Sequence, residues 1–355
     1  MGRNLQITFS QAINEALVLS MKKDKNLICY GLGVSDVKNV FNTTRNLKNL
    51  FGKKRVFDVP CSENALTGIS VGAALAGVRS VVTHQRLDFF LLALDQLVNS
   101  AAKWYYMFGS QISVPITIRL IIGKGWGQGP THSQNLQSWF NHIPGLKIVM
   151  PSTPEDAKGL LISSILDPNP VIFLEHRWLH NITSKVQREY YVTPIGKAKI
   201  LKRGKDMTIL SMSYLCLEAI KAAKFLYERY KIQCEIIDLR SIKPLDWKTI
   251  LNSIKKTGNL IVLDTAAETN SLSGEIIAKI TIENSKFLKN PPKRIAMPDC
   301  PEPTSQALAK FFFISHEKIV KTVLRILMKK NNFKISYAEN KINYDNPYQN
   351  FEGPF

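Results

Sequence analysis

The sequence predicts an α/β protein with two parallel-sheet domains. Short apolar runs rich in β-branched residues alternate with stretches of helical periodicity along most of the 355 residues. This alternation is typical of parallel strands joined by right-handed helical crossovers. At roughly 100 to 200 residues per domain, the length allows two domains. The content of 45% hydrophobic and 21% charged residues is that of an ordinary globular chain.

The first half of the chain contains clear helix starts. Thr8 and Gln11 have the spacing of a capping box ahead of an apolar periodic stretch. Residues 152–156 read Ser-Thr-Pro-Glu-Asp, which places a cap, a proline and two acids in the order of a helix start. Ser62 is the expected cap of a small-residue helix. Around these starts we expect strands near 27–31, 78–83, 114–122, 146–150 and 170–175, and helices over 62–77 and 88–108.

A polar segment at 176–206 is interpreted as a linker into the second domain, with the boundary near residue 193. The two domains then cover 1–193 and 194–330. Residues 331–355 are rich in Asn and Lys, and we expect a tail that packs on a partner or stays mobile. The second domain is expected to contain strands near 207–212, 234–238, 260–264 and 294–296, and helices near 214–230, 246–255, 272–281 and 316–328.

The charge and the cysteines narrow the range of partners and compartments. A formal net charge of +19 suggests nucleic acid, but the basic runs are short and scattered, so nucleic acid is not the expected partner. No apolar run approaches the roughly 18 residues of a membrane span, so no membrane partner is expected. Five scattered cysteines without metal-ligand spacing suit a reducing compartment, and a cytoplasmic location is expected.

A glycine-rich loop at 123–130, Gly-Lys-Gly-Trp-Gly-Gln-Gly-Pro, follows one of the expected strands. Backbone amides in such a position can cradle phosphates. The loop nevertheless lacks the third glycine of a dinucleotide fingerprint and the Lys-Ser/Thr pair of a phosphate-binding P-loop. A flexible loop that lines a cleft is an equally good interpretation.

Several motifs in order carry a resemblance to a known family. Residues 57–65 read Phe-Asp-Val-Pro-Cys-Ser-Glu-Asn-Ala and are followed by the small-residue pattern of 68–77. Further matching segments lie at 93–103, 132–134, 144–146, 155–160, 169–171, 194–198 and 237–244. Over about residues 5–328 the chain resembles the beta subunit of thiamine-diphosphate-dependent 2-oxo acid dehydrogenases of the pyruvate and branched-chain type, within the transketolase-like superfamily.

The resemblance implies a pyrimidine-binding domain over 1–193 and a transketolase C-terminal-type domain after it. It also implies that Glu63 hydrogen-bonds the aminopyrimidine ring of thiamine diphosphate, that Phe89 stacks on this ring, and that His132 is the active-site histidine. By residue type alone, Glu63 would be an acid set against a helix dipole, Phe89 a core residue and His132 a cap or surface residue. The resemblance further implies that Asp167 and Asn169 belong to a loop that holds a structural potassium ion, chiefly through backbone oxygens.

A missing motif implies a second chain. In the family, magnesium holds the cofactor's diphosphate on a Gly-Asp-Gly motif, because a hard cation prefers carboxylate and amide oxygens. The sequence contains no Gly-Asp-Gly. The resemblance therefore implies that a separate alpha chain carries the magnesium half of the site in an alpha2beta2 assembly, with the helix at 88–108 in its interfaces. A lipoyl acyl-carrier component is the implied acceptor.

Departures from the family pattern leave the substrate open. His84 and Arg86 stand before Phe89, where relatives carry an acidic-to-apolar segment. These polar and cationic residues are candidate contacts to a larger or anionic substrate. Such a substrate also suits an alternative function, a transketolase-like ketol or acyl transfer in sugar or cell-surface polysaccharide synthesis. A non-catalytic basic assembly module is a third interpretation.

Overall fold

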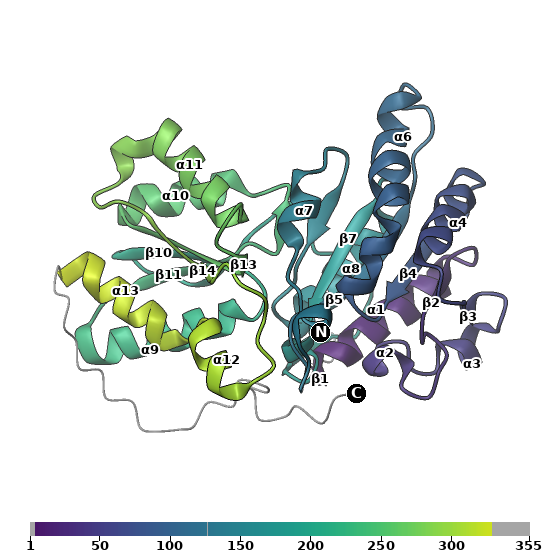
Figure 1. Ribbon diagram of the computed structural model, residues 1–355, viewed down its shortest axis with the longest axis horizontal. Coiled ribbons are helices and arrows are strands. Elements are labelled where there is room, and N and C mark those ends of the chain that lie inside the picture. The colour runs from purple at the N-terminus through teal and green to yellow at the C-terminus, as the bar shows by residue number, and fades with distance from the viewer. Residues whose placement is uncertain (1–3, 126, 329–355) are drawn as a thin grey trace. The chain divides into compact units, whose positions relative to one another are not determined.

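A seven-stranded sheet, parallel except at one edge, forms the core of the first part of the chain (Figure 1). The computed structural model describes residues 4–125 and 127–328, and these form two compact units. The first unit extends to Gly196 and also includes Ser241–Pro244, while the second starts at Lys197. The predicted α/β class is confirmed. The boundary near 193 stays a prediction, as does the tail at 331–355, which lies outside the described residues.

The first sheet has the strand order β12-β6-β7-β5-β4-β2-β3. Its central strands are buried along their whole length, which explains their nearly continuous apolar sequences, because helices cover parallel sheets on both faces. The strands are β2 (Ile28–Gly31), β3 (Val56–Asp58), β4 (Ser80–His84), β5 (Ile116–Ile122), β6 (Lys147–Val149), β7 (Val171–His176) and β12 (Ser241–Lys243).

Two predicted helix starts are confirmed and one is wrong in its detail. Thr8 and Gln11 form the capping box of α1 (Phe9–Lys23), and the Thr153 hydroxyl accepts a hydrogen bond from the amide of Asp156 at the start of α8 (Pro154–Leu166). Ser62 precedes α4 (Glu63–Leu75), but its side chain makes no capping hydrogen bond. Its φ of −157° and ψ of 68° lie outside the β-region geometry typical of a capping residue.

The region predicted as one helix over 88–108 is helical but not uniform. It consists of α5 (Leu87–Phe90), a 3-10 turn η1 (Leu91–Ala93), a π-helical segment η2 (Gln96–Ala101) and α6 (Ala102–Met107). Apolar periodicity does not distinguish a π-bulge from an α-turn. The α4 helix packs against η1 and η2.

The polar segment predicted as a linker contains regular structure. It holds a 3-10 turn η4 (Arg177–Leu179), β8 (Thr183–Gln187) and β9 (Lys199–Lys202). β8 pairs antiparallel with β1 (Asn4–Thr8), and of its residues only Val186 is buried, against Ile7 and Ala12. With a single inward side chain, this strand resembles a loop in sequence.

The remaining helices of the first unit are short. One of them, α2, is a left-handed turn in which all four residues have positive φ. They are α2 (Asn39–Asn42), α3 (Leu47–Phe51), η3 (Pro130–His132) and α7 (Gln137–His142).

The second unit has a five-stranded sheet of order β14-β13-β10-β11-β9, parallel except for the edge strand β9. Helices α9 and α13 cover one face and α10 and α11 the other (Figure 1). The short helix α12 was not predicted. The elements are β10 (Met207–Ser211), α9 (Leu215–Tyr230), β11 (Cys234–Asp238), α10 (Trp247–Thr257), β13 (Leu260–Ala267), α11 (Leu272–Asn284), η5 (Ser285–Phe287), β14 (Lys293–Met297), α12 (Gln306–Phe312) and α13 (His316–Met328). Within the described ranges, no helix is long and apolar enough to span a membrane.

Candidate functional site

The three residues with implied catalytic or cofactor roles each follow a strand of the first sheet. Glu63 follows β3, Phe89 follows β4 and His132 follows β5. All three strands are parallel, so these residues lie at the carboxyl edge of one sheet. Ligands of open α/β sheets bind at that edge.

Glu63 is the first residue of α4, and its side chain is largely withdrawn from water. It is 8% exposed, whereas Ser62 and Asn64 on either side of it are exposed. Within residues 4–125 and 127–328, its carboxylate has no hydrogen-bond or ion-pair partner. Its carboxylate oxygens are not among the fully buried polar atoms that lack a partner, so they reach solvent at the sheet edge. The first turn of α4 therefore presents a carboxyl group that is open to a further hydrogen bond.

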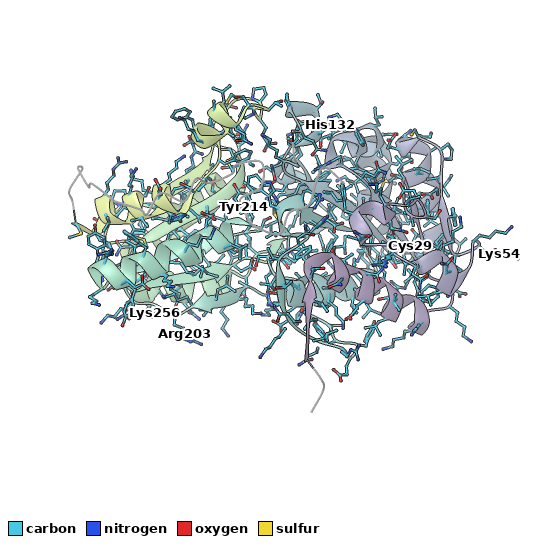
Figure 2. The ribbon with its side chains drawn as sticks, turned by 90° about the horizontal axis from the view of Figure 1, so that it is seen from below. Cys29, Lys54, His132, Arg203, Tyr214 and Lys256 are labelled. Atoms are coloured by element: carbon cyan, nitrogen blue, oxygen red, sulfur yellow. The ribbon has the colours of Figure 1, made fainter. Side chains whose placement is uncertain are left out.

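The ring of Phe89 contacts the ring of His132. Their centroids are 5.3 Å apart and the ring planes are nearly perpendicular, at 87°. Phe89 is half-buried and His132 is exposed (Figure 2). The Nδ1 atom of His132 lies 3.0 Å from the hydroxyl oxygen of Thr131. The structure thus brings two of the implied site residues together, Phe89 from α5 after β4 and His132 from η3 after β5.

Arg86 fastens the glycine-rich loop to the β4 side of the sheet edge. Its Nη1 donates to the carbonyl oxygen of Gly123 at 2.8 Å, and its Nη2 donates to Oε1 of Gln128. The same Oε1 accepts a hydrogen bond from the amide of Gly125 at 2.9 Å. Arg86 therefore fixes both ends of this part of the loop. The role of Gln128 has no sequence signal, because it depends on a contact 42 residues away.

His84 lies at the end of β4 in apolar surroundings. The side chain is fully buried, its ring packs edge-on against Phe90 at 4.9 Å, and neither ring nitrogen has a hydrogen-bond partner among the described residues. Burial lowers the pKa of His84 to about 4, so it is neutral near pH 7. A contact between His84 and the substrate stays a prediction, and the burial of the side chain argues against it.

The loop with the implied potassium contacts is already occupied by cationic side chains. The Nζ of Lys147 lies 2.6 and 2.8 Å from the two carboxylate oxygens of Asp167. Arg79 donates to the carbonyl oxygens of Ile165 and Asp167, and the Asn169 amide donates to Oδ1 of Asp167. Because these cationic side chains already bind its oxygens, the loop fits a potassium ion poorly. The part of the chain that the structure describes contains no cluster of three or more His, Cys, Asp or Glu residues that could hold a metal.

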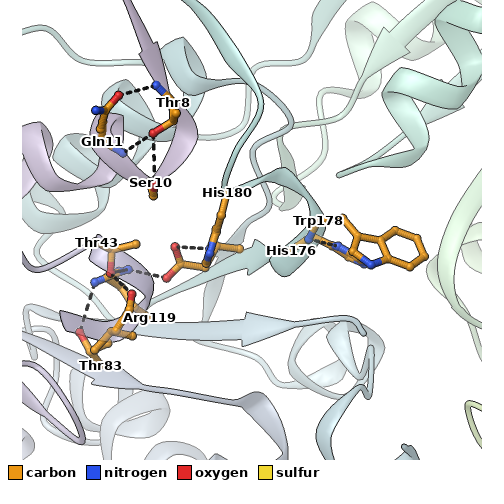
Figure 3. A network of polar contacts seen from close by, with 11 residues as sticks. Thr8, Ser10, Gln11, Thr43, Thr83, Arg119, His176, Trp178 and His180 are labelled. Carbon is orange, nitrogen blue, oxygen red and sulfur yellow. Dashed lines mark hydrogen bonds and ion pairs between the residues drawn. The ribbon is translucent and has the colours of Figure 1, made fainter. Parts of the chain in front are cut away.

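Behind the sheet edge lies a buried polar network that the sequence did not reveal (Figure 3). Arg119 on β5 pairs with Glu175 on β7 at 2.6 Å, and both side chains are fully buried. His180 approaches the other carboxylate oxygen of Glu175 at 3.4 Å. Burial is the largest single effect and would raise the pKa of Glu175, but the charge of Arg119, joined by the charge of His180 and by hydrogen bonds from His180 and Arg119, holds the pKa below the ordinary value. The sequence signal is one arginine inside the apolar strand Ile-Thr-Ile-Arg-Leu-Ile-Ile.

Comparisons with known proteins agree with this architecture. Residues 6–181 match the family model of the transketolase pyrimidine-binding domain, and residues 196–319 match that of the transketolase C-terminal domain. A solved structure described as a split gene transketolase, an inactive beta4 tetramer, superposes with a TM-score of 0.73. The superposition covers 91% of this chain and 98% of the solved chain, at 19% sequence identity, and it supports the fold.

Among curated proteins, the chain is similar to beta subunits of oxidoreductases. The acetoin:2,6-dichlorophenolindophenol oxidoreductase subunit beta of Bacillus subtilis is 38% identical over 90% of this chain and 97% of its own length. The pyruvate dehydrogenase E1 component subunit beta of Rickettsia bellii is 37% identical over 91% of this chain and 99% of its own length. The pyruvate dehydrogenase E1 component subunit beta of Rhizobium meliloti is 38% identical over 91% of this chain and 70% of its own length.

Proposed function

Because this chain belongs to the transketolase-like family that includes the beta subunits of the pyruvate dehydrogenase E1 component, we propose that it is the beta chain of a thiamine-diphosphate-dependent 2-oxo acid dehydrogenase. In this function it belongs to the decarboxylating component and passes an acyl group to lipoyl. The observation that supports this most is Glu63, a residue that is 8% exposed at the sheet edge and whose carboxylate has no partner among the described residues.

Glu63 has the central role in this proposal. Bound thiamine diphosphate supplies the electron sink for loss of carbon dioxide from a 2-oxo acid. The carboxyl group of Glu63 shares a proton with the pyrimidine nitrogen, a role that needs an acid held away from water. The ring of Phe89 stacks on the pyrimidine and fixes its plane.

His132 is the proposed proton carrier in the later half of the reaction. Its ring is exposed and held between Phe89 and the hydroxyl of Thr131. An imidazole ring can both accept and donate a proton, which is what acyl transfer requires of a proton carrier.

A separate alpha chain is the proposed partner. No Gly-Asp-Gly motif for magnesium occurs in the 355 residues, so we propose that the alpha chain brings this motif in an alpha2beta2 assembly. The end of α6 and the residues after it expose apolar side chains that an interface would bury: Tyr105, Tyr106, Met107, Phe108 and Ile112. A cytoplasmic location is part of the same proposal.

A second candidate function is ketol or acyl transfer in sugar or cell-surface polysaccharide synthesis. The buried cations at the carboxyl edge, Arg86 among them, favour it, because sugar phosphates and acidic sugars carry anionic groups. The two functions share the chemistry of Glu63 and differ in the acceptor.

The experiment that tests the proposed function is assembly followed by turnover. We expect the chain to copurify with an alpha chain that contains Gly-Asp-Gly. The pair should then decarboxylate at least one member of a 2-oxo acid panel with an artificial electron acceptor, and each chain alone should be inactive. An assembled pair that turns over no 2-oxo acid but transfers a ketol group to an aldose would favour the second candidate.

A further inference from the structure

A basic surface lies at the amino edge of the second sheet, the edge at which its parallel strands begin. Strands β13, β10 and β11 are parallel neighbours, and β14 is parallel to β13, so the segments that lead into these strands share this edge. We call the surface the basic edge. Six exposed side chains on these segments form it: Arg203, Lys205, Lys231, Lys255, Lys286 and Lys289.

Hydrogen bonds hold the segments of the basic edge side by side. The carbonyl oxygen of Gln233, before β11, accepts from the backbone amides of Lys205 and Asp206, before β10, each at 3.0 Å. The side-chain amide of Asn259, before β13, donates to the carbonyl oxygen of Asp206 at 2.8 Å. The backbone amide of Lys289 donates to the carbonyl oxygen of the glycine that ends α10, at 2.7 Å. The basic edge is therefore one continuous surface, although its residues are far apart in the sequence.

The carboxylates near the basic edge already have partners. Glu235 on β11 is buried and pairs with Lys256, which lies at this edge beside the six cations (Figure 2). Asp206 accepts a hydrogen bond from a backbone amide before β11 at 2.7 Å. Glu228 and Glu283, near the ends of α9 and α11, pair with lysines four residues earlier in their own helices. These acids therefore leave the six cations without a carboxylate of their own.

The fold accounts for only part of this charge. Within residues 4–125 and 127–328, none of the six side chains forms an ion pair or a side-chain hydrogen bond. The ends of α9 and α10 stabilise Lys231 and Lys255, because a helix carries a partial negative charge at its C-terminus. Arg203 and Lys205 lie between β9 and β10, where no helix ends. Like charges gathered in this way repel each other, and the surface keeps a positive potential.

The aromatic rings at the basic edge carry lysines over them. The ammonium groups of Lys255 and Lys286 lie 5.0 and 5.3 Å from the ring centroid of Phe287. Two further lysines each lie 5.6 Å from the ring centroid of Tyr227. Single-stranded nucleic acids bind largely by stacking their bases on open aromatic faces. Rings covered by ammonium groups instead hold these groups in place as point charges, which favours carboxylates over bases.

We propose that the basic edge binds an acidic polypeptide segment of a partner protein, one in which several Asp or Glu side chains lie close together. Such a segment supplies the carboxylates that the six cations lack. Exposed charges that match in this way contribute chiefly to the rate and specificity of association. The inference goes beyond the proposed function, because the basic edge belongs to the second unit and Glu63, Phe89 and His132 belong to the first.

The test measures the binding of a fluorescent oligoglutamate peptide to the full-length chain by anisotropy at low ionic strength. In the double variant Lys205→Glu/Lys289→Glu, we expect Kd to rise by about tenfold or more, because two attractions become repulsions. The matched control is Lys53→Glu/Lys54→Glu, which changes the net charge equally at exposed positions of the first unit (Figure 2). Its Kd should stay within about twofold of the wild-type value. Both variants should keep the wild-type Tm, since these four side chains form no hydrogen bond or ion pair with the described residues.

Two other polyanions are measured beside the peptide: a single-stranded oligonucleotide of the same charge, and vesicles of phosphatidylcholine with phosphatidylserine. Tightest binding of the peptide, lost in Lys205→Glu/Lys289→Glu and kept in the control, would support the inference. Equal losses in the two double variants would show that the net charge of the chain alone attracts the peptide, and would overturn it. Tighter binding of the oligonucleotide or of the vesicles would assign the surface to nucleic acid or to a membrane and would also overturn it, as would a wild-type chain that does not bind the peptide.

Discussion

The ring of His132 stands at 87° to the ring of Phe89, with their centroids 5.3 Å apart. Phe89 lies in α5 after β4 and His132 in η3 after β5, so the contact joins the segments that follow two adjacent strands. Perpendicular aromatic pairs of this kind contribute about 0.5–1.5 kcal/mol beyond the burial of their surface.

Changing either ring should affect a different step. Phe89→Ala removes the proposed stacking surface, so we expect weaker cofactor binding, by about tenfold or more in Kd. His132→Asn keeps a polar side chain but removes the titrating group, and it should slow acyl transfer to lipoyl more than decarboxylation with an artificial acceptor. Calorimetry measures the first effect, and the ratio of the two assays measures the second. Phe89→Tyr is the matched control, and equal losses in both assays for His132→Asn would contradict its assignment.

The buried ion pair between Arg119 and Glu175 should control the stability of the first unit. Arg119→Met leaves Glu175 as a buried charge without its main partner, which typically costs about 3–5 kcal/mol. Lys224→Met breaks the exposed pair with Glu228 and should cost less than about 0.5 kcal/mol. Urea denaturation of both variants measures the difference. A similar small change in both would show that Arg119 and Glu175 are not held as the structure has them.

Protonation of His84 should lower the stability of the folded protein at acid pH. Its pKa is about 4 when folded and about 6.5 when unfolded, so the unfolded chain binds more protons between these values. The free energy of unfolding therefore falls as pH drops from about 6.5 to about 4, by about 1.4 kcal/mol per pH unit from this residue. His84→Phe removes that contribution and places an apolar ring against Phe90, so it should raise Tm at pH 5 more than at pH 8.

His180 has the same direction of shift, again chiefly through burial, so some acid sensitivity should remain in His84→Phe. The exposed His142 offers a control, since His142→Phe should leave the pH profile of Tm unchanged. Parallel Tm profiles for His84→Phe and the wild-type protein would contradict the buried neutral state. Retained turnover in His84→Phe would also remove His84 from the substrate contacts.

Much of the fold was predictable because its signals are local. The capping box at Thr8, the helix start at Thr153 and the apolar strands β4, β5 and β7 each follow from a few neighbouring residues. Strand β12 escaped prediction because its three residues form a strand only by pairing with β6, far away in the sequence. The same reason applies to β8, which has one buried residue.

The residues of the candidate site also divide into those that the sequence indicated and those that it did not. Glu63, Phe89 and His132 were predicted as site residues through motifs shared with a family, because each alone resembles a helix acid, a core ring or a surface residue. No such motif marks Gln128. Its contact with Arg86 joins segments 42 residues apart, which periodicity and composition do not encode.

The decisive measurement is the decarboxylation rate of Glu63→Gln, assembled with its alpha chain and supplied with thiamine diphosphate, magnesium and an artificial electron acceptor. Glutamine has nearly the same size but cannot share a proton with the pyrimidine nitrogen. Glu317→Gln removes the same charge from the first turn of α13 and serves as the control. We expect Glu63→Gln to lose at least about a thousandfold in kcat, with assembly and Tm unchanged and Glu317→Gln fully active. A Glu63→Gln enzyme that keeps more than about a tenth of the wild-type rate would contradict the account.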